Sequence, residues 1–129
     1  MKQQSRPVFL NLFQIKMPIM AIMSILHRAS GALLVLAIPY ISYLFALSLE
    51  SEQGYMQVQE HLSGILVKII MLLLGWGVLH HLLSGIRFLF LDFDIGVDRV
   101  NGRITALLAT GIAATVALVS AVFILGVVQ

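Results

Sequence analysis

Three long apolar runs restrict what this chain can fold into. They span residues 29–49, 66–91 and 104–128, and each can cross the roughly 30 Å hydrocarbon core of a bilayer as a helix of about 20 residues. Only 11% of the 129 residues are charged, against about 25% in soluble domains. The sequence therefore predicts an all-α integral membrane protein with three transmembrane helices in a single domain, residues 1–129.

Residues 1–23 precede the first run, and we expect them to form a short cytoplasmic or interfacial arm. Within it, Asn11 is a suitable cap for a short helix. A helix that began at Pro18 and continued through the first run would be roughly 48 Å long. Because that length exceeds the hydrocarbon core, its extra turns would lie at the interface or under a partner. We expect Pro39 to kink this helix.

Composition removes several classes of function. The chain has no cysteine, which excludes disulfides, thiolate metal sites and iron–sulfur ligation by this chain. Its net charge of +2, without a basic cluster, gives no reason to expect nucleic acid as a partner. The amino terminus stays polar for too long to be a cleavable signal peptide.

The placement of lysine and arginine predicts the orientation of the chain. Basic residues lie before or at the start of the first run and after the second, at Lys2, Arg6, Lys16, Arg28, Arg99 and Arg103. The first connection, residues 50–61, contains glutamates but neither lysine nor arginine. Because cytoplasmic segments are enriched in lysine and arginine, we expect the amino terminus and the second connection to be cytoplasmic. The first connection and the carboxyl terminus would lie on the far side.

Two adjacent histidines, His80 and His81, lie near the middle of the second run. Ionisable residues at this depth are costly and are functional candidates, and a neutral imidazole here suits an axial haem ligand. Gly77 and Gly85 share a helix face with His81 and would leave a bare surface for a flat porphyrin. We therefore favour His81 as the ligand. The alternative is a helix–helix hydrogen bond without a metal, with the glycines forming a close helix contact.

His80 faces another direction, because adjacent helical positions differ by about 100°. It shares its face with Trp76 and Ser84, and we expect it to pack or to form a hydrogen bond. One central histidine leaves a bis-histidine haem without its second ligand, and three helices contain a haem poorly. The chain is therefore expected to be half of a heterodimeric, haem-binding anchor bundle.

The stretch SILHRASG, residues 24–31, places polar side chains at the start of the first run. Ser24 and Arg28 share a helix face, with His27 beside it. Arg28 suits a carboxylate such as a haem propionate, and Ser24 suits a quinone oxygen. The alternative is that Arg28 extends to lipid phosphates while Ser24 bonds a carbonyl of its own helix.

The remaining polar residues receive structural interpretations. Arg87, in the last turns of the second run, is either an interfacial anchor, which we favour, or a second propionate partner. Asp92, Asp94 and Asp98 are expected to end one helix and cap the next. His61 is expected to be solvated.

The motifs of this chain resemble those of a known family. Arg6-Pro7, the stretch SILHRASG, and His81 followed by LLSGIRFLFLD are similar to the cytochrome b-556 membrane anchors of succinate dehydrogenase, respiratory complex II. The resemblance extends over nearly the whole chain. It implies a companion anchor subunit that supplies the second haem ligand and a quinone-binding tyrosine. It also implies iron–sulfur and flavoprotein subunits on the cytoplasmic face of a bacterial inner membrane, with the carboxyl terminus in the periplasm.

The resemblance also implies roles for individual residues. His81 would be the axial ligand of the haem b iron, Ser24 and Arg28 would line the quinone site, and His27 and Arg28 would contact haem propionates. The chain would have no catalytic residue of its own, but would belong to an enzyme that passes electrons from succinate to ubiquinone. Phe88 stands where many relatives carry a histidine near the haem edge, so one propionate contact is unmatched.

Three other functions are alternatives to this one. The anchor of a quinol:fumarate reductase would use the same residues for the reverse reaction. A cofactor-free structural anchor would use His81 only for packing. A small transporter subunit is disfavoured, because the chain has no pair of broken helices.

Overall fold

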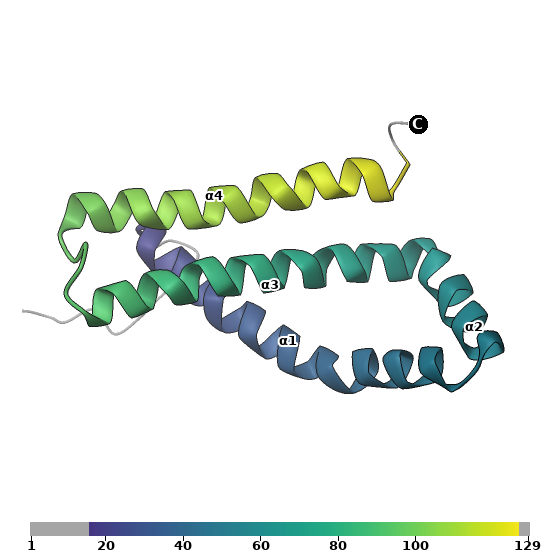
Figure 1. Ribbon diagram of the computed structural model, residues 1–129. Coiled ribbons are helices and arrows are strands. Elements are labelled where there is room, and N and C mark those ends of the chain that lie inside the picture. Colours follow the sequence, from purple (N-terminus) through teal and green to yellow (C-terminus); the bar gives the residue numbers. More distant parts are fainter. Residues whose placement is uncertain (1–15, 127–129) are drawn as a thin grey trace, which may run out of the picture.

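The computed structural model describes residues 16–126 and contains four helices in that range (Figure 1). They are α1 (Ile19–Glu50), α2 (Glu52–Ser63), α3 (Ile65–Asp92) and α4 (Arg99–Ile124). By length and composition, α1, α3 and α4 can each cross a membrane, and the described residues contain no strand. The prediction of an all-α membrane protein with three spanning helices is confirmed.

The helix ends differ from the expected spans in two places. α1 begins at Ile19, directly after Pro18 in an extended conformation, so residues 19–23 of the expected arm are the first turns of this helix. The expected cap Asn11 lies outside the described residues. α4 ends before residue 128, where we expected the third span to end.

A further helix, α2, lies where we expected a simple connection. The hydroxyl oxygen of Ser51 accepts a hydrogen bond from the N–H of Gly54 at 3.0 Å, and Glu52 lies in the first turn, where the helix dipole favours an acid. Near the other end of α2, the Nε2 atom of His61 is 2.6 Å from the hydroxyl oxygen of Tyr40 in α1. His61 is exposed, as expected for a solvated residue, but it also connects α2 to α1.

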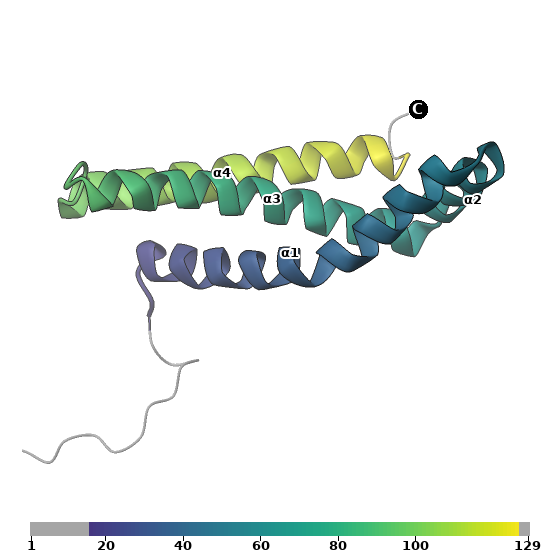
Figure 2. The ribbon, with the colours of Figure 1, turned by 60° about the horizontal axis from the view of Figure 1, so that its bottom comes forward.

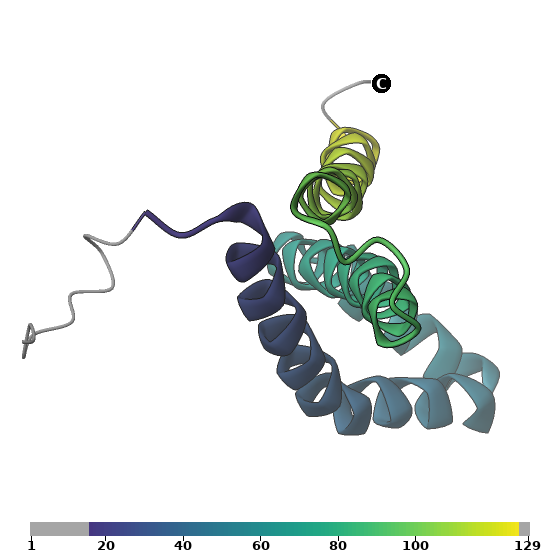
Figure 3. The same ribbon diagram turned by 90° about the vertical axis from the view of Figure 1, so that its left-hand side faces the viewer.

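α3 contacts both α1 and α4, and an end-on view shows it between them (Figure 3). α4 runs alongside α3, whereas α1 crosses it at an angle (Figure 1). The buried side chain of Met23 from α1 packs with Ala106 and Ala109 of α4. The buried face of α4 consists of small residues, which let membrane helices approach closely: Gly102, Ala106, Ala109 and Ala113.

α1 bends along its length (Figures 1 and 2). Pro39 lies inside it, and we attribute the bend to this residue, because proline removes a backbone hydrogen bond and displaces the preceding turn. Beyond the bend, α1 separates from α3 (Figure 3) and exposes large apolar side chains, with Tyr43 and Phe45 each 64% exposed. This half of α1 is therefore free to meet lipid or another chain.

The turn between α3 and α4 ends in a helix cap. Asp94 has a positive φ of 58°, a conformation that aspartate tolerates better than most residues. The carboxylate of Asp98 accepts hydrogen bonds from the backbone N–H groups of Asn101 at 2.9 Å and Val100 at 3.1 Å. These donors, Asn101 foremost, hold the pKa of Asp98 below its ordinary value. The expected capping role of Asp98 is confirmed.

Candidate functional site

His81 is held against α1 by three contacts. Its Nδ1 atom is 3.1 Å from the backbone carbonyl oxygen of His27 and 3.4 Å from the hydroxyl oxygen of Ser30. The rings of His27 and His81 are stacked, with their centroids 4.1 Å apart and 11° between their planes. The position and the orientation of the His81 ring are therefore both set by α1.

These contacts assign the proton on the His81 ring. A carbonyl oxygen only accepts hydrogen bonds, so Nδ1 carries the hydrogen and donates it to the carbonyl of His27. Both hydrogen bonds of this ring within the described residues involve Nδ1, which leaves the lone pair of Nε2 for another partner. Metal-ligating histidines commonly donate their other ring N–H in this way. The geometry therefore suits His81 to act as a ligand through Nε2.

Two residues that the sequence analysis did not single out shape this contact. Gly31 provides the space for the ring, because a Cβ atom at this position would lie 2.9 Å from Cε1 of His81. Ser30 is 1% exposed, and its hydroxyl donates to the same His27 carbonyl at 2.9 Å. Both follow His27 by three or four positions and so lie on its helix face, a signal that the stretch SILHRASG already contained.

The bare surface that we expected on either side of His81 is covered by α1. A Cβ atom added to Gly77 would lie 3.6 and 3.8 Å from two leucine side chains of α1. A Cβ atom added to Gly85 would lie 3.5 Å from Nε2 of His27. The expectation that these glycines leave room for a porphyrin stays a prediction. They allow α1 to pack closely on α3, which was the alternative interpretation.

His80 lies inside the bundle and has no exposed surface. Its Nδ1 atom is 3.2 Å from the hydroxyl oxygen of Ser84, and its ring lies 5.2 Å from that of Trp76. These are the packing and hydrogen-bonding contacts that the sequence analysis expected on this face. His80 therefore lies on a different face of α3 from the contact between His81 and α1.

Ser24, His27 and Arg28 lie together on one turn of α1. Arg28 is exposed, whereas Ser24 and His27 are half-buried. The Nε2 atom of His27 is buried without a hydrogen-bond partner in the described part of the chain, and its ring makes an edge contact with Phe88 at 5.1 Å. The ring stacked on His81 therefore carries the unpartnered nitrogen, and the next residue, Arg28, carries an exposed guanidinium.

The family of this chain follows from comparison with known proteins. A family model described as the succinate dehydrogenase/fumarate reductase transmembrane subunit matches residues 2–122. The chain belongs to this family. It is 35% identical over 103 residues to a succinate dehydrogenase cytochrome b556 subunit of Coxiella burnetii, covering 78% of this chain and 82% of that protein. It is 32% identical over 91 residues to the subunit of the same name from Rickettsia bellii, covering 70% of each chain.

Membership in the succinate dehydrogenase/fumarate reductase transmembrane family confirms the resemblance seen in the motifs. The matched range includes α1, α2, α3 and most of α4, so the His81 contact and the turn with Ser24 and Arg28 both lie in the family's part of the chain. Family membership and the three long apolar helices together identify this chain as a multi-pass membrane protein.

Arg87 has a different environment from the one we expected in this membrane subunit. Its side chain is 9% exposed. Its Nε atom donates to the hydroxyl of Thr105 at 2.9 Å, and Nη2 donates to the backbone carbonyl of Gly102 at 3.0 Å. Arg87 therefore connects α3 to α4 inside the bundle, a contact that the sequence analysis did not expect, and the favoured interpretation as an interfacial anchor stays a prediction.

Proposed function

We propose that this chain is a membrane-anchor subunit of succinate:ubiquinone oxidoreductase. In this proposal it ligates a b-type haem through Nε2 of His81 and forms one wall of the ubiquinone-reduction site with Ser24 and Arg28. The observation that carries the proposal is the hydrogen bond from Nδ1 of His81 to the His27 carbonyl, which leaves Nε2 free to bind iron. Family membership supports the wider role.

The second axial ligand would come from a companion anchor subunit. His27 is stacked on His81 and so cannot approach the same iron from the opposite side. His80 is fully buried between the helices, and His61 hydrogen-bonds Tyr40 in another part of the bundle. The described residues therefore support one ligand from this chain. A haem bound there would supply a one-electron redox centre.

His27 and Arg28 would bind the propionates of that haem. The Nε2 atoms of His27 and His80 are both buried without a partner in the described part, and an unpaired buried polar atom is costly unless a ligand satisfies it. Of the two, His27 is the one that lies beside the exposed Arg28. The exposed guanidinium of Arg28 matches a carboxylate well. Arg28 and Ser24, one helical turn apart, would also donate to a quinone carbonyl oxygen.

The chain would act in an assembly rather than alone. We propose that its amino terminus and the α3–α4 turn face the cytoplasm of a bacterial inner membrane, with iron–sulfur and flavoprotein subunits docked there and the carboxyl terminus in the periplasm. The exposed apolar half of α1 beyond Pro39 is a suitable surface for the companion anchor. Electrons from succinate would then reach ubiquinone at the cytoplasmic end of the bundle.

A reduced-minus-oxidised visible spectrum of the purified assembly tests the haem proposal. We expect a b-type signal that is lost in His81→Ala and kept in His80→Gln, which preserves a polar side chain beside Ser84. Subunit composition, read from a gel, controls for loss of assembly. A wild-type assembly without a haem signal would rule out ligation and favour a purely structural anchor.

The quinone proposal needs two assays on the same preparation. Ser24→Ala and Arg28→Leu should lower succinate-driven quinone reduction, because each removes a donor to the quinone carbonyl. Succinate oxidation by an artificial acceptor, which bypasses the membrane subunits, should be unchanged. Equal losses in the two assays would indicate damaged assembly, whereas unchanged quinone reduction in both variants would contradict the assignment. Faster fumarate reduction by quinol than succinate oxidation would instead favour the reverse reaction.

A further inference from the structure

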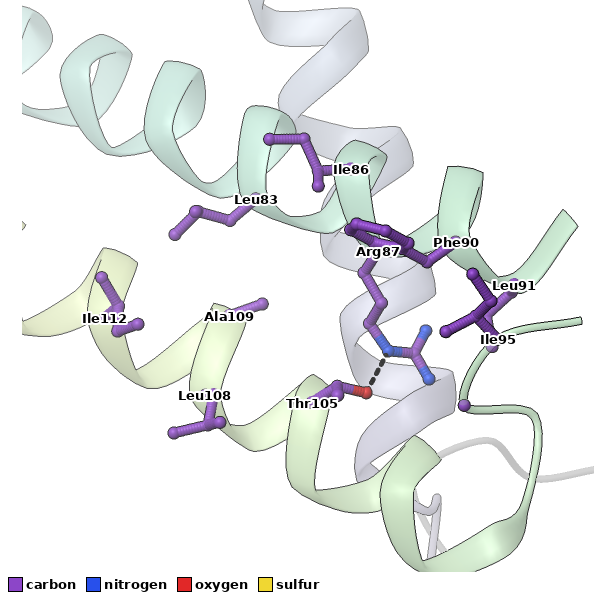
Figure 4. A pocket seen from close by; sticks show the side chains of 11 residues that line it. Leu83, Ile86, Arg87, Phe90, Leu91, Ile95, Thr105, Leu108, Ala109 and Ile112 are labelled. Atoms are coloured by element: carbon purple, nitrogen blue, oxygen red, sulfur yellow. Dashed lines mark hydrogen bonds between the residues drawn. The ribbon is translucent and has the colours of Figure 1, made fainter. Parts of the chain in front are cut away.

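A groove on the outer surface of the bundle, between α3 and α4, contains a buried arginine (Figure 4). Its volume of about 410 Å³ lies within the range of small-molecule sites. Its walls are apolar and include Leu83, Ile86, Phe90, Leu108 and Ile112. Several of these are partly exposed, with Phe90 52% and Leu108 56% exposed. This groove is therefore open at the surface of the chain.

Arg87 is the charged residue of this groove. Its guanidinium lies 5.7 Å from the centre of the Phe88 ring, and its two hydrogen-bond partners within the described residues are neutral. They are the hydroxyl of Thr105 and the carbonyl of Gly102. The guanidinium has five N–H groups, so these two bonds leave Nη1 and one N–H of Nη2 available. No carboxylate of the described residues forms an ion pair with it. A buried cation without a counter-ion is costly, and this points to an anion supplied from outside the chain.

Thr105 cannot supply that charge or a second donor. Its hydroxyl accepts from Arg87 and donates to the backbone carbonyl of Asn101 at 2.9 Å. What the groove offers a ligand is therefore a long apolar surface and the free N–H groups of one guanidinium. A ligand that fits both features has an apolar chain and an anionic, oxygen-rich head.

We propose that this groove binds an anionic phospholipid, with its phosphate on Arg87 and an acyl chain along α3 and α4. Arg87 precedes the end of α3 at Asp92 by five positions, about 7.5 Å along the axis. The guanidinium thus lies close enough to the interface to meet a phosphate. A quinone would fill the apolar walls equally well, but it is neutral and would leave the charge unpaired. The proposal depends on the membrane location of α3 and α4, not on the proposed redox function.

The charged side chains near Arg87 are compatible with a phosphate bound to it. Asp92, Asp94 and Asp98 are exposed, and Asp98 is engaged with the first turn of α4. Arg99 and Arg103, in the first turns of α4, are also exposed and add positive charge near the same end of the bundle. The buried position of Arg87 distinguishes it from these two arginines, which makes Arg103 a suitable control.

Native mass spectrometry of the detergent-purified assembly tests the proposal. The assembly is delipidated and supplied with dioleoyl phosphatidylglycerol or dioleoyl phosphatidylcholine. We expect retention of phosphatidylglycerol to fall about tenfold in Arg87→Gln, because a charge-assisted bond is lost. It should also fall in Leu108→Trp, which fills the groove and leaves Arg87 in place. Arg103→Gln and Leu118→Trp, an exposed position of α4 outside the groove, should retain the lipid.

Four outcomes would overturn the proposal. Equal retention of the two lipids by the wild-type assembly would exclude recognition of the anionic head. Retention unaffected by Leu108→Trp would exclude the groove. An equal loss in Arg103→Gln would indicate general surface attraction, and displacement by a short-chain ubiquinone would identify a quinone as the occupant. If Arg87→Gln fails to assemble, Arg87→Lys, which keeps the charge, must retain the lipid while Leu108→Trp loses it.

Discussion

The polar contacts between helices are buried in one part of this bundle and exposed in another. From the middle of the bundle to the α3–α4 turn, the buried polar residues are Ser30, His80, Ser84 and Arg87, and the apolar cluster of Met23, Ala106 and Ala109 is buried beside them. Near the α2 end, Tyr40 and His61 meet in an exposed hydrogen bond. A bilayer removes most of the benefit of burying apolar groups and raises the cost of exposing polar ones. Loss of a buried polar contact is therefore expected to cost this bundle more than loss of the exposed one.

The largest effect that tests this contrast is expected from Gly31→Val. A Cβ atom there would lie 2.9 Å from the His81 ring, and overpacking of this kind costs about 3 kcal/mol. We expect most of the b-type haem signal to be lost, measured as the reduced-minus-oxidised spectrum per assembled complex. Gly111→Val is the control, because a Cβ atom at Gly111 meets nothing within 4 Å. An unchanged haem signal in Gly31→Val would show that this contact does not position His81.

Arg87→Met should give the next largest effect. It removes the bonds to Thr105 and Gly102 and should destabilise the packing of α3 on α4 by about 2 kcal/mol. Thermal unfolding of the assembly in detergent would measure the loss. Arg103→Met, at an exposed position, should change stability by no more than about 0.5 kcal/mol. Equal effects of the two variants would contradict a structural role for the burial of Arg87.

At the opposite end of the bundle, Tyr40→Phe should have a smaller effect. It removes the hydrogen bond to His61, whose side chain is exposed, so water can replace the lost partner. We expect a loss of about 0.5 kcal/mol by the same thermal measurement, with the haem spectrum unchanged. A loss of haem in Tyr40→Phe would show that the two ends of the bundle are coupled and would weaken the contrast between them.

The smallest effect concerns the cap of α4. Because the folded state lowers the pKa of Asp98, its stabilisation is fully present above the unfolded value, about pH 4. It declines as the pH falls through the lowered folded value. Hydrogen exchange of the Val100 and Asn101 amides, corrected for intrinsic rates, should therefore accelerate at low pH. Asp98→Asn caps without titrating, so it should remove this pH dependence. Persistence of the dependence in Asp98→Asn would assign it to another group.

The sequence was sufficient to predict the main architecture. The low charge and three apolar runs predicted three spanning helices, and Asp98 was correctly expected to cap the last of them. α2 was missed because its residues are polar and the apolar runs drew the interpretation, although Ser51 and Glu52 form a recognisable start signal. The contact of Arg87 with α4 was missed for a different reason. A position near the end of an apolar run does not say whether a side chain points to the interface or into the bundle.

By itself, the sequence determined the class of the protein, its family motifs and which faces of α1 and α3 carry polar residues, because these depend on local spacing and on the cost of charge in a bilayer. Only the tertiary structure decided what those faces meet. It brought His27 onto His81, covered Gly77 and Gly85 with α1, and connected Arg87 to α4. Such contacts depend on how the helices cross, and the positions of residues along each helix do not specify the crossing.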